Sequence, residues 1–259
     1  MRFTFHILFL LSVSIFAQEP IEANLIKKTV FKADKIIAID NFETIYFVNN
    51  NVFNKKTLDK TITYNNLQLG NLTSANAFNP LKINLFYKDF NTVIILDNRL
   101  AEIFKIDFNT LNPYKNASHI STGHDNTLWV FNQDLQKLEL FDYKTQTTRA
   151  QTAPVQSAVL DLKSNYNYCW LLTEKFLYRY NYFGSLVKKI KNEGYTSLVE
   201  SNENIILKKE NTLFYLKENS DEPRLIETSN LLINQFFVTN QTLYIYNNEI
   251  LQQLQLKIK

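Results

Sequence analysis

One kind of short apolar run returns at a nearly constant interval along this chain. The runs are TIYFVN at Thr44, TVIILDN at Thr92, TLWVFN at Thr127, YCWLLT at Tyr168, NIILKK at Asn204 and TLYIYN at Thr242. Their starts are 48, 35, 41, 36 and 38 residues apart. Most of these runs are apolar at consecutive positions, which is typical of a strand covered on both faces. An interval of about 40 residues holds four short strands with their turns, so the sequence predicts repeated four-stranded units.

Polar turn residues recur at the same interval as the apolar runs. One residue of this kind precedes each run: Asp40, Asp89, Asp125, Asn165, Asn202 and Asn240. Asp and Asn accept local backbone hydrogen bonds and tolerate left-handed dihedral angles. The chain has only 4 Gly, so we expect Asn to replace Gly at left-handed turn positions. After the run, a second hydrophobic stretch ends in a polar turn, as in residues 52–57, 103–110, 138–145, 177–184 and 213–220.

The two ends of the chain are predicted to meet in one sheet. The last unit supplies three strands, within LLINQFFVTN, QTLYIYNN and EILQQLQLKIK. The run LIKKTVF, from Leu25 to Phe31, precedes the first complete unit. If this run became the fourth strand of the last unit, non-covalent pairing would close a ring and hide two sheet edges.

Residues 123–145, GHDNTLWVFNQDLQKLELFDYKT, resemble a blade of the sensory and quinoprotein-like bacterial β-propellers. The resemblance covers residues 36–258, and the third unit matches the pattern best. It implies an all-β fold, a six-bladed β-propeller of four-stranded antiparallel blades closed by the N-terminal strand, with seven blades as the alternative. In those families the ring senses or binds a partner through its faces or holds a cofactor at its axis.

The first seventeen residues, MRFTFHILFLLSVSIFA, have the three-part pattern of a secretory signal peptide. Arg2 supplies a positive charge, and an apolar run from Ile7 to Phe16 leads to the small residue Ala17. We expect cleavage after Ala17, which leaves residues 18–259 as a single propeller domain. The apolar run is shorter than the roughly 20 residues that a membrane-spanning helix needs, so no transmembrane span is expected.

The residue usage points to an exported bacterial protein. A single Cys cannot form an intramolecular disulfide, and disulfide-free export is easiest to reconcile with a bacterial periplasm. Heavy use of Asn, Lys, Ile, Phe and Tyr is typical of AT-rich bacterial genomes such as those of the Bacteroidetes. The sequence predicts a periplasmic, cell-envelope or secreted protein of a Gram-negative bacterium. Cys169 lies in an apolar stretch and is expected to be a small buried residue.

Charge and motif content argue against several function classes. The chain has 28 Lys and Arg against 25 Asp and Glu, a net charge of +3, which is too small to predict nucleic-acid binding. Phosphate-binding loops, HExxH motifs, CxxC pairs and GxSxG elbows are missing from the sequence. We therefore predict no catalytic, cofactor-binding or metal-ligating residues and no cofactor, and an enzyme is not the favoured expectation.

Two histidines and one short segment are the remaining candidates for chemistry. His119 and His124 are five residues apart, which places them on opposite faces of a continuous strand. A bulge near Gly123 would be needed to bring them to one metal site. Ser121, His124 and Asp125 lie together in ISTGHD. Neighbouring residues of a strand point apart, so a hairpin turn is favoured over a catalytic triad.

The turn residues that recur once per unit leave one enzymatic alternative open. By symmetry they would share one face of the ring, and their oxygens are of the type and number that Ca²⁺ binds. Propeller hydrolases and lactonases hold Ca²⁺ at the ring axis with such residues. Hairpin formation explains the same residues without a metal.

The favoured function is that of an exported, non-enzymatic binding or scaffold module that acts through the loops on one face of the ring. The expected partner is a protein or a glycan of the cell envelope, because exposed Tyr side chains suit either. The alternatives are a Ca²⁺-dependent hydrolase or lactonase-like enzyme with an axial metal, and a structural accessory of an envelope complex.

Overall fold

Strands make up almost all of the regular structure. The computed structural model describes residues 19–228 and 231–258. These residues form 24 β-strands and three short 3-10 helices, η1 (Leu67–Leu69), η2 (Lys88–Phe90) and η3 (Phe108–Thr110). Within the described ranges, no helix is long and apolar enough to cross a membrane. The predicted signal peptide, residues 1–17, lies outside them.

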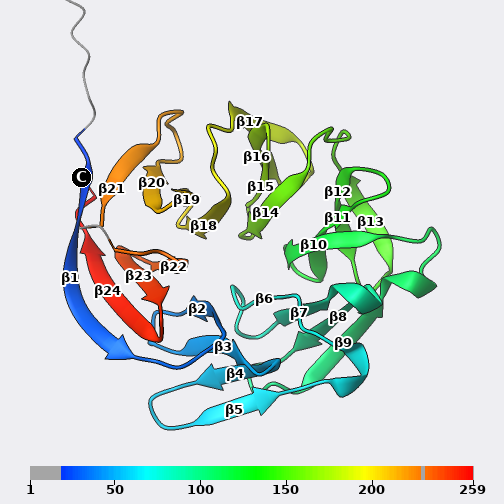
Figure 1. Cartoon of the computed structure of the whole chain (residues 1–259). Coiled ribbons are helices and arrows are strands. Elements are labelled where there is room, and N and C mark those ends of the chain that lie inside the picture. The colour runs from blue at the N-terminus through cyan, green and yellow to red at the C-terminus, as the bar shows by residue number, and fades with distance from the viewer. Residues whose placement is uncertain (1–18, 229–230, 259) are drawn as a thin grey trace, which may run out of the picture.

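Four separate antiparallel sheets, called blades 1 to 4 here, follow one another along the chain (Figure 1). Blade 1 contains β2 (Lys35–Ile39), β3 (Ile45–Asn49), β4 (Val52–Lys56) and β5 (Thr61–Tyr64). Blade 2 contains β6 (Ser74–Asn76), β7 (Ile83–Tyr87), β8 (Thr92–Leu96) and β9 (Glu102–Asp107). Blade 3 contains β10 (Ala117–Thr122), β11 (Thr127–Asn132), β12 (Lys137–Asp142) and β13 (Thr147–Gln151). Blade 4 contains β14 (Val159–Ser164), β15 (Tyr168–Thr173), β16 (Phe176–Asn181) and β17 (Leu186–Lys191).

The remaining strands form one eight-stranded sheet. Its first half contains β18 (Ser197–Ser201), β19 (Asn204–Lys209), β20 (Thr212–Leu216) and β21 (Arg224–Glu227). Its second half contains β22 (Gln235–Thr239), β23 (Thr242–Asn247), β24 (Ile250–Leu256) and β1 (Ile21–Val30). Each half is antiparallel, and the halves join where β1 pairs in parallel with β21.

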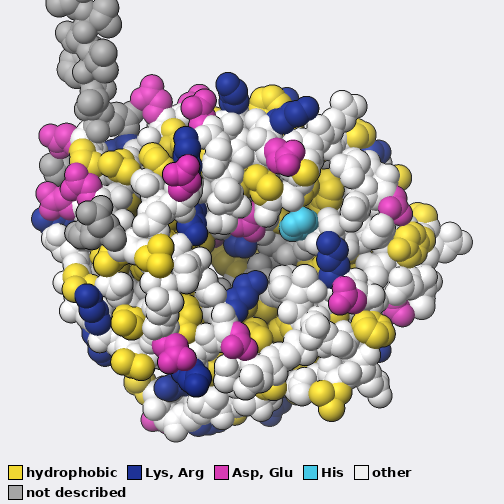
Figure 2. Space-filling model, viewed as in Figure 1, with side chains coloured by type: hydrophobic (Ala, Val, Ile, Leu, Met, Phe, Trp, Pro, Cys, Tyr) yellow, Lys and Arg dark blue, Asp and Glu magenta, His cyan; other side chains and the backbone are white. Residues whose placement is uncertain are grey.

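The first strand of each blade and of each sheet half lies innermost. In ring order these strands are β2, β6, β10, β14, β18 and β22; each contacts the next, and β22 contacts β2. The sheets therefore form a closed ring (Figure 1), and the space-filling view shows a hollow at its centre (Figure 2).

The strand β1 changes the number of separate sheets that the sequence predicted. The run from Leu25 to Phe31 was expected to complete the last unit, and β1 does so by pairing antiparallel with β24. However, β1 begins earlier, and Ile21 and Glu22 extend past the end of β24 to pair with Ile226 and Glu227 of β21. The prediction of six separate blades, or seven, is therefore wrong: four blades and one eight-stranded sheet are present, because a long strand bridges two edges.

Blade 2 is out of phase with the predicted repeat. The run that begins at Thr92 is the third strand, β8, and the second strand is β7. Of the predicted stretch 103–110, residues 103–107 accordingly lie in the fourth strand, β9, and residues 108–110 form η3. Both β7 and β8 are buried along their whole length, but Asn84 interrupts the apolar pattern of β7. The sequence prediction therefore aligned the repeat on the uninterrupted apolar run of β8, although the second position of the blade belongs to β7.

The hydrophobic core lies in layers between neighbouring sheets. Val93 and Ile95 of β8 pack against residues of blade 3, whereas Ile94 and Leu96 pack against residues of blade 1. Apolar side chains on both faces explain why the predicted runs are apolar at consecutive positions. The same packing holds the inner strands, and the turns that leave them, in place.

Asparagine occupies several left-handed turn positions, as the scarcity of glycine predicted. The dihedral angle φ is 47° at Asn91, 50° at Asn202 and 55° at Asn240. A short polar side chain tolerates this conformation better than a bulky one because it can bond to nearby backbone groups. The turns of the ring are thus built largely without glycine.

Candidate binding face

One face of the ring carries the turns between the first and second strands of each unit and those between the third and fourth strands. We call it the turn face. Five residues of the predicted once-per-unit set lie on it: Asp40, Asp125, Asn165, Asn202 and Asn240. Asp89 does not, because it lies in η2 between β7 and β8, at the opposite face. The prediction that all six share a face is therefore wrong at Asp89, where the loop of residues 77–82 takes the expected place.

The polar side chains of these turns bond mainly to their own turns. Asp40 Oδ1 accepts hydrogen bonds from the backbone N of Phe42 and of Thr44, each at 2.9 Å. Asn165 Oδ1 accepts from the backbone N of Asn167 at 2.9 Å and of Tyr168 at 2.8 Å. In the part of the chain that the structure describes, no group of three or more His, Cys, Asp and Glu side chains is arranged to hold a metal ion. These oxygens act as turn formers.

The segment ISTGHD is a hairpin turn, as the sequence favoured. Gly123 N donates to Thr127 O at 3.0 Å. Ser121 is fully buried, and its hydroxyl bonds to Ser164 Oγ at 2.7 Å. His124 is exposed and lies 3.0 Å from the Asp125 carboxylate. The serine and the histidine of this segment therefore do not form a catalytic pair.

The structure places His119 and His124 in separate surroundings. His119 lies within β10, where Nδ1 is 3.0 Å from Ser118 Oγ. His124 lies in the turn after β10, and its ring contacts aromatic residues of blade 4. The β-bulge of this strand falls between Ala117 and His119 and not near Gly123.

Cys169 is a packing residue in β15. Its side chain is fully buried in the core between blades 3 and 4. Burial disfavours the thiolate and raises the pKa of the thiol well above its usual value. The sequence expectation of a buried residue is confirmed.

Five aromatic side chains form a connected cluster on the turn face, which we call the aromatic patch. Its members are Phe78, His124, Tyr166, Tyr182 and Phe183. The ring centroid of Tyr166 lies 5.1 Å from that of Phe78 and 6.2 Å from that of His124. The ring centroid of Tyr182 lies 6.2 Å from that of His124 and 4.0 Å from that of Phe183. The patch thus spans turns of blades 2, 3 and 4.

The rings of the aromatic patch are open to solvent. Phe183 is 66% exposed and Tyr182 is 44% exposed, while Phe78 and Tyr166 are each 41% exposed. Large apolar groups that gather on a surface commonly mark a site of interaction.

A buried polar network fixes the inner strands below the patch. Ser121 Oγ accepts from Asn76 Nδ2 at 3.1 Å. Thr122 Oγ1 accepts from Asn84 Nδ2 at 2.9 Å and donates to Asn76 Oδ1 at 3.1 Å. Buried hydrogen bonds of this kind restrict the groups they join. The turns of blades 2 and 3 therefore leave from a rigid base.

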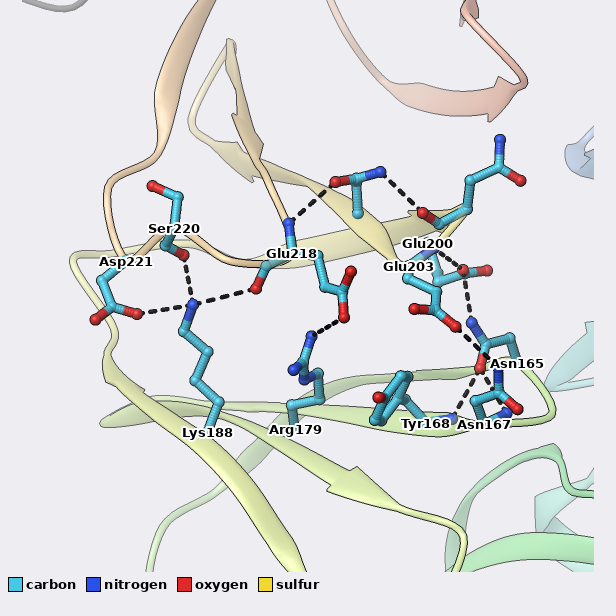
Figure 3. Close-up of polar contacts among 12 residues, drawn as sticks. Asn165, Asn167, Tyr168, Arg179, Lys188, Glu200, Glu203, Glu218, Ser220 and Asp221 are labelled. Carbon is cyan, nitrogen blue, oxygen red and sulfur yellow. Dashed lines mark hydrogen bonds and ion pairs between the residues drawn. The ribbon is translucent and has the colours of Figure 1, made fainter.

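Ion pairs connect blade 4 to the eight-stranded sheet beside the patch (Figure 3). Arg179 Nη1 lies 3.4 Å from Glu218 Oε1, and its guanidinium group stacks 4.5 Å from the centre of the Tyr168 ring. Lys188 Nζ lies 2.7 Å from Asp221 Oδ1. Figure 3 shows Lys188 and Arg179 pointing from blade 4 toward the loop that carries Glu218 and Asp221.

Two amide-to-carboxylate bonds cross the same boundary closer to the ring axis. Asn165 Nδ2 donates to Glu200 Oε1 at 2.9 Å, and Asn167 Nδ2 donates to Glu203 Oε1 at 2.8 Å. Burial raises the pKa of Glu200, and the negative charge of Glu203 adds to this rise. The two carboxylates therefore lie side by side in a partly enclosed place.

Two pockets open along the eight-stranded sheet, one at its boundary with blade 4 and one between its two halves. One, of about 280 Å³, lies between Trp170, Leu177 and Ile205, with Arg179 and Glu218 among its polar lining residues. The other, of about 460 Å³, lies between the sheet halves and is lined by Ser201, Asn202, Asn204, Ile206, Tyr215, Val238, Asn240, Gln241, Leu256 and Ile258. Neither lies in the aromatic patch.

Comparison with known proteins gives a match in structure only. No protein-family model matches the chain, and a search of curated proteins finds no match. Among solved structures, a catalytically inactive variant of virginiamycin B lyase from Staphylococcus aureus, with quinupristin, matches with a TM-score of 0.61, 12% identity, and coverage of 94% of this chain and 97% of the other. A chain of a mitotic checkpoint complex matches with a TM-score of 0.60 and 10% identity, and the match covers 98% of this chain and 99% of the other. The WD40 domain of Neurospora crassa Pan2 matches with a TM-score of 0.57 and 8% identity, and the match covers 83% of this chain and 73% of the other.

These neighbours and the closed ring of four-stranded units decide the fold. The protein is a β-propeller. At such low identity the likeness concerns the fold alone, and a β-propeller can carry unrelated functions. The function must therefore be argued from the surface of this propeller.

Sequence reasoning did not identify the aromatic patch. It weighed His124 as a chemical group and named exposed Tyr side chains as contacts for a partner, but it did not connect them with Phe78 or Tyr166. A signal was present, since large aromatics stand inside the turn sequences FNP, NYN and NYFG. An aromatic residue in a polar turn is exposed more often than one within a strand.

Proposed function

We propose that this β-propeller is a non-enzymatic binding module whose aromatic patch docks a protein partner. The observation that carries the proposal is the chain of ring contacts from Phe78 to Phe183 across three neighbouring blades. Exposed aromatic side chains on rigid turns supply contact area at a low cost in conformational entropy. A rigid ring that presents such turns on one face suits a binding or scaffold role.

The arrangement of the rings favours a protein over a glycan. Tyr166 meets Phe78 at an interplanar angle of 75° and His124 at 85°. Edge-to-face rings of this kind form ridges and gaps, into which apolar side chains of a partner can insert. Tyr and Phe are enriched in protein interfaces. A glycan partner would instead be expected to stack on flat, exposed ring faces.

The test uses a variant in which Tyr166, Tyr182 and Phe183 are replaced by Ala. Phe42→Ala is the matched control, because Phe42 is 83% exposed in a turn of the same face and takes no part in the patch. A photo-crosslinking residue at position 182 would capture the partner, which is then identified, purified and titrated against each variant.

We expect the triple variant to bind the purified partner at least ~10-fold more weakly, which is about 1.4 kcal/mol, with an unchanged melting temperature. The control variant should bind like the wild type. Equal binding by all three proteins would overturn the proposal. Binding of a polysaccharide in place of a protein, if the triple variant abolished it, would overturn the choice of partner.

We also propose that the chain is exported to the periplasm or cell envelope of a Gram-negative bacterium, or secreted from it. Residues 1–17 support this through their signal-peptide pattern. Sequencing of the N-terminus of the mature protein should find Gln18 as the first residue. An intact Met1 in the purified native protein would contradict export by this route.

The calcium-enzyme alternative is not favoured, because Asp40 and Asn165 direct oxygens to their own turns. Metal analysis and melting curves with a chelator separate the two functions. Stoichiometric Ca²⁺ with a melting temperature that chelation lowers would overturn the non-enzymatic proposal. A metal-free protein that melts identically in chelator would support it.

A further inference from the structure

The pocket between the two halves of the eight-stranded sheet has an apolar floor and a polar mouth. Ile206 and Leu256 are buried at its floor, and the partly buried Val238 adds to the aliphatic lining. Asn202 and Gln241 are exposed and belong to the turns that follow β18 and β22. The pocket therefore opens on the turn face. Apolar walls with a few polar groups are the usual lining of a ligand-binding pocket.

Of the described residues that line this pocket, none is charged. The pocket beside blade 4 differs, since Arg179 and Glu203 are among its lining residues. Arg224 pairs with Tyr215 across the strands but does not line the pocket, and its guanidinium group donates to the backbone O of Glu19. A charged group that entered the uncharged pocket would lose its water without gaining a counter-charge. The lining therefore favours an uncharged ligand.

Tyr215 supplies an unused polar group to the pocket. The residue is only 7% exposed, and its hydroxyl makes no hydrogen bond with any residue of the described ranges. A buried tyrosine hydroxyl usually has such a partner. The fully enclosed side-chain atoms that lack a partner there are Asn84 Oδ1, Arg179 Nε and Gln252 Oε1. The Tyr215 hydroxyl is not one of them, so it is open to the pocket that the side chain lines.

Three side chains at the mouth also have unused hydrogen-bonding groups. The hydroxyl of Ser201 and the side-chain amides of Asn202 and Gln241 bond to no residue in the part of the chain that the structure describes. Asn204 differs, because its Nδ2 donates to Asn202 O at 2.8 Å and its Oδ1 accepts from Glu218 N at 3.0 Å. A side-chain amide carries both a donor and an acceptor, as a peptide group does. The mouth therefore matches the peptide groups of a ligand.

We propose that this pocket binds a short uncharged peptide segment, which inserts one aliphatic side chain between the two sheet halves. The aliphatic floor removes that side chain from water. The unused groups of Asn202, Gln241 and Tyr215 bond to the peptide groups that flank it. None of the five residues of the aromatic patch lines the pocket, so this proposal and the proposed function do not depend on each other.

The test titrates the full mature chain with blocked amino acids that share two peptide groups and differ in their side chain. N-acetyl-leucinamide carries an aliphatic side chain, N-acetylglycinamide carries none, and the α-amide of N-acetylaspartate carries a carboxylate. Methyl glucoside serves as a fourth probe, which is uncharged but has hydroxyl groups in place of peptide groups. Nuclear magnetic resonance of the isotope-labelled protein reports the affinity and identifies the backbone amides that respond.

Two variants change the pocket in different ways. Val238→Phe fills it, and Tyr215→Phe removes the hydroxyl while keeping the ring. The matched controls are Val187→Phe and Tyr114→Phe. Val187 is 43% exposed on β17 and Tyr114 is 50% exposed in the loop after η3, and neither lines the pocket.

We expect saturable binding of N-acetyl-leucinamide, with responses at the backbone amides of Asn202 and Gln241. The glycine and aspartate probes should bind at least ~10-fold more weakly, because the first buries no side chain and the second would bury a charge. Val238→Phe should abolish binding without lowering the melting temperature, since the added ring occupies existing space. Tyr215→Phe should weaken binding ~5-fold through the loss of one hydrogen bond. Both controls should bind like the wild type.

Four results would overturn the proposal. The first is the lack of saturable binding of N-acetyl-leucinamide. The second is equal affinity for the leucine and glycine probes, which would show that no side chain is inserted. The third is tighter binding of the glucoside than of N-acetyl-leucinamide, which would exclude a peptide ligand. The fourth is unchanged binding in both pocket variants. If Val238→Phe melts at a lower temperature than the wild type, Tyr215→Phe decides alone, and unchanged binding by it overturns the proposal.

Discussion

Lys115 bonds to Glu139 inside the wall between blades 2 and 3, where both residues are almost completely buried. Their relative exposures are 5% and 2%. Lys115 Nζ also donates to Thr148 Oγ1 at 2.9 Å, and Asn132 Nδ2 donates to Glu139 Oε1 at 3.3 Å. The ion pair therefore has the additional hydrogen bonds that buried charges need.

Replacing only one partner of this pair should be costly. Lys115→Met leaves the Glu139 carboxylate buried without its counter-charge, and we expect the free energy of unfolding to fall by about 3–5 kcal/mol. Urea denaturation of the purified variant measures this change.

The double variant Lys115→Met/Glu139→Leu is the control for that experiment. It should recover most of the lost stability, because apolar side chains of similar volume can replace a buried ion pair. A single variant as stable as the wild type would show that the pair contributes no more than an exposed one.

The closing strand β1 offers a second prediction through its first residue. Ile21 is fully buried against Ile226, Leu254 and Leu256, where the two sheet halves join. Ile21→Ala leaves a cavity there, and we expect a loss of about 2–5 kcal/mol in the free energy of unfolding.

Leu25→Ala is the matched control, since Leu25 lies on the same strand but is 52% exposed. Its effect on urea denaturation should be within about 0.5 kcal/mol. If the two variants were equally stable, the contact between β1 and β21 would not contribute to closure of the ring.

Glu200 should make stability depend on pH. Its pKa is raised in the folded protein by burial and by the charge of Glu203. The folded state therefore binds the proton more tightly than the unfolded state. The stabilisation that results is fully present below the unfolded pKa of about 4.3. It is lost as the pH rises through the folded pKa. At neutral pH the ionised Glu200 consequently lowers stability.

The variant Glu200→Gln keeps the neutral shape and an oxygen for the bonds from Asn165 and Glu203 N. We expect it to melt at a higher temperature than the wild type at pH 7 and at the same temperature near pH 4. Glu174→Gln, in an exposed turn, should show no such trend. Parallel melting curves of Glu200→Gln and wild type at every pH would contradict the prediction.

Much of the local structure could be predicted from the sequence. The run TLWVFN became β11 between two core layers, because apolar residues at consecutive positions require cover on both faces. Asn202 and Asn240 formed left-handed turns, because the conformational preference belongs to the residue itself. The strand that closes the last unit was also found, since its apolar run had no other partner.

Other features could not be predicted from neighbouring residues. In blade 2, β7 and β8 are equally buried, so their order in the repeat depends on which one pairs with the short inner strand β6. Asp89 was consequently placed on the wrong face. The contact between Phe78 and Tyr166 joins two turns that are distant in sequence, and only the closed ring brings them together.

The sequence by itself determined the all-β architecture, the repeat of about 40 residues and the polar turns, because these depend on side-chain periodicity and backbone preference within a few residues. The tertiary structure alone decided that β1 joins two sheet halves and that five rings form one patch. Those relationships come from ring closure, which sets distances between residues that no local pattern relates.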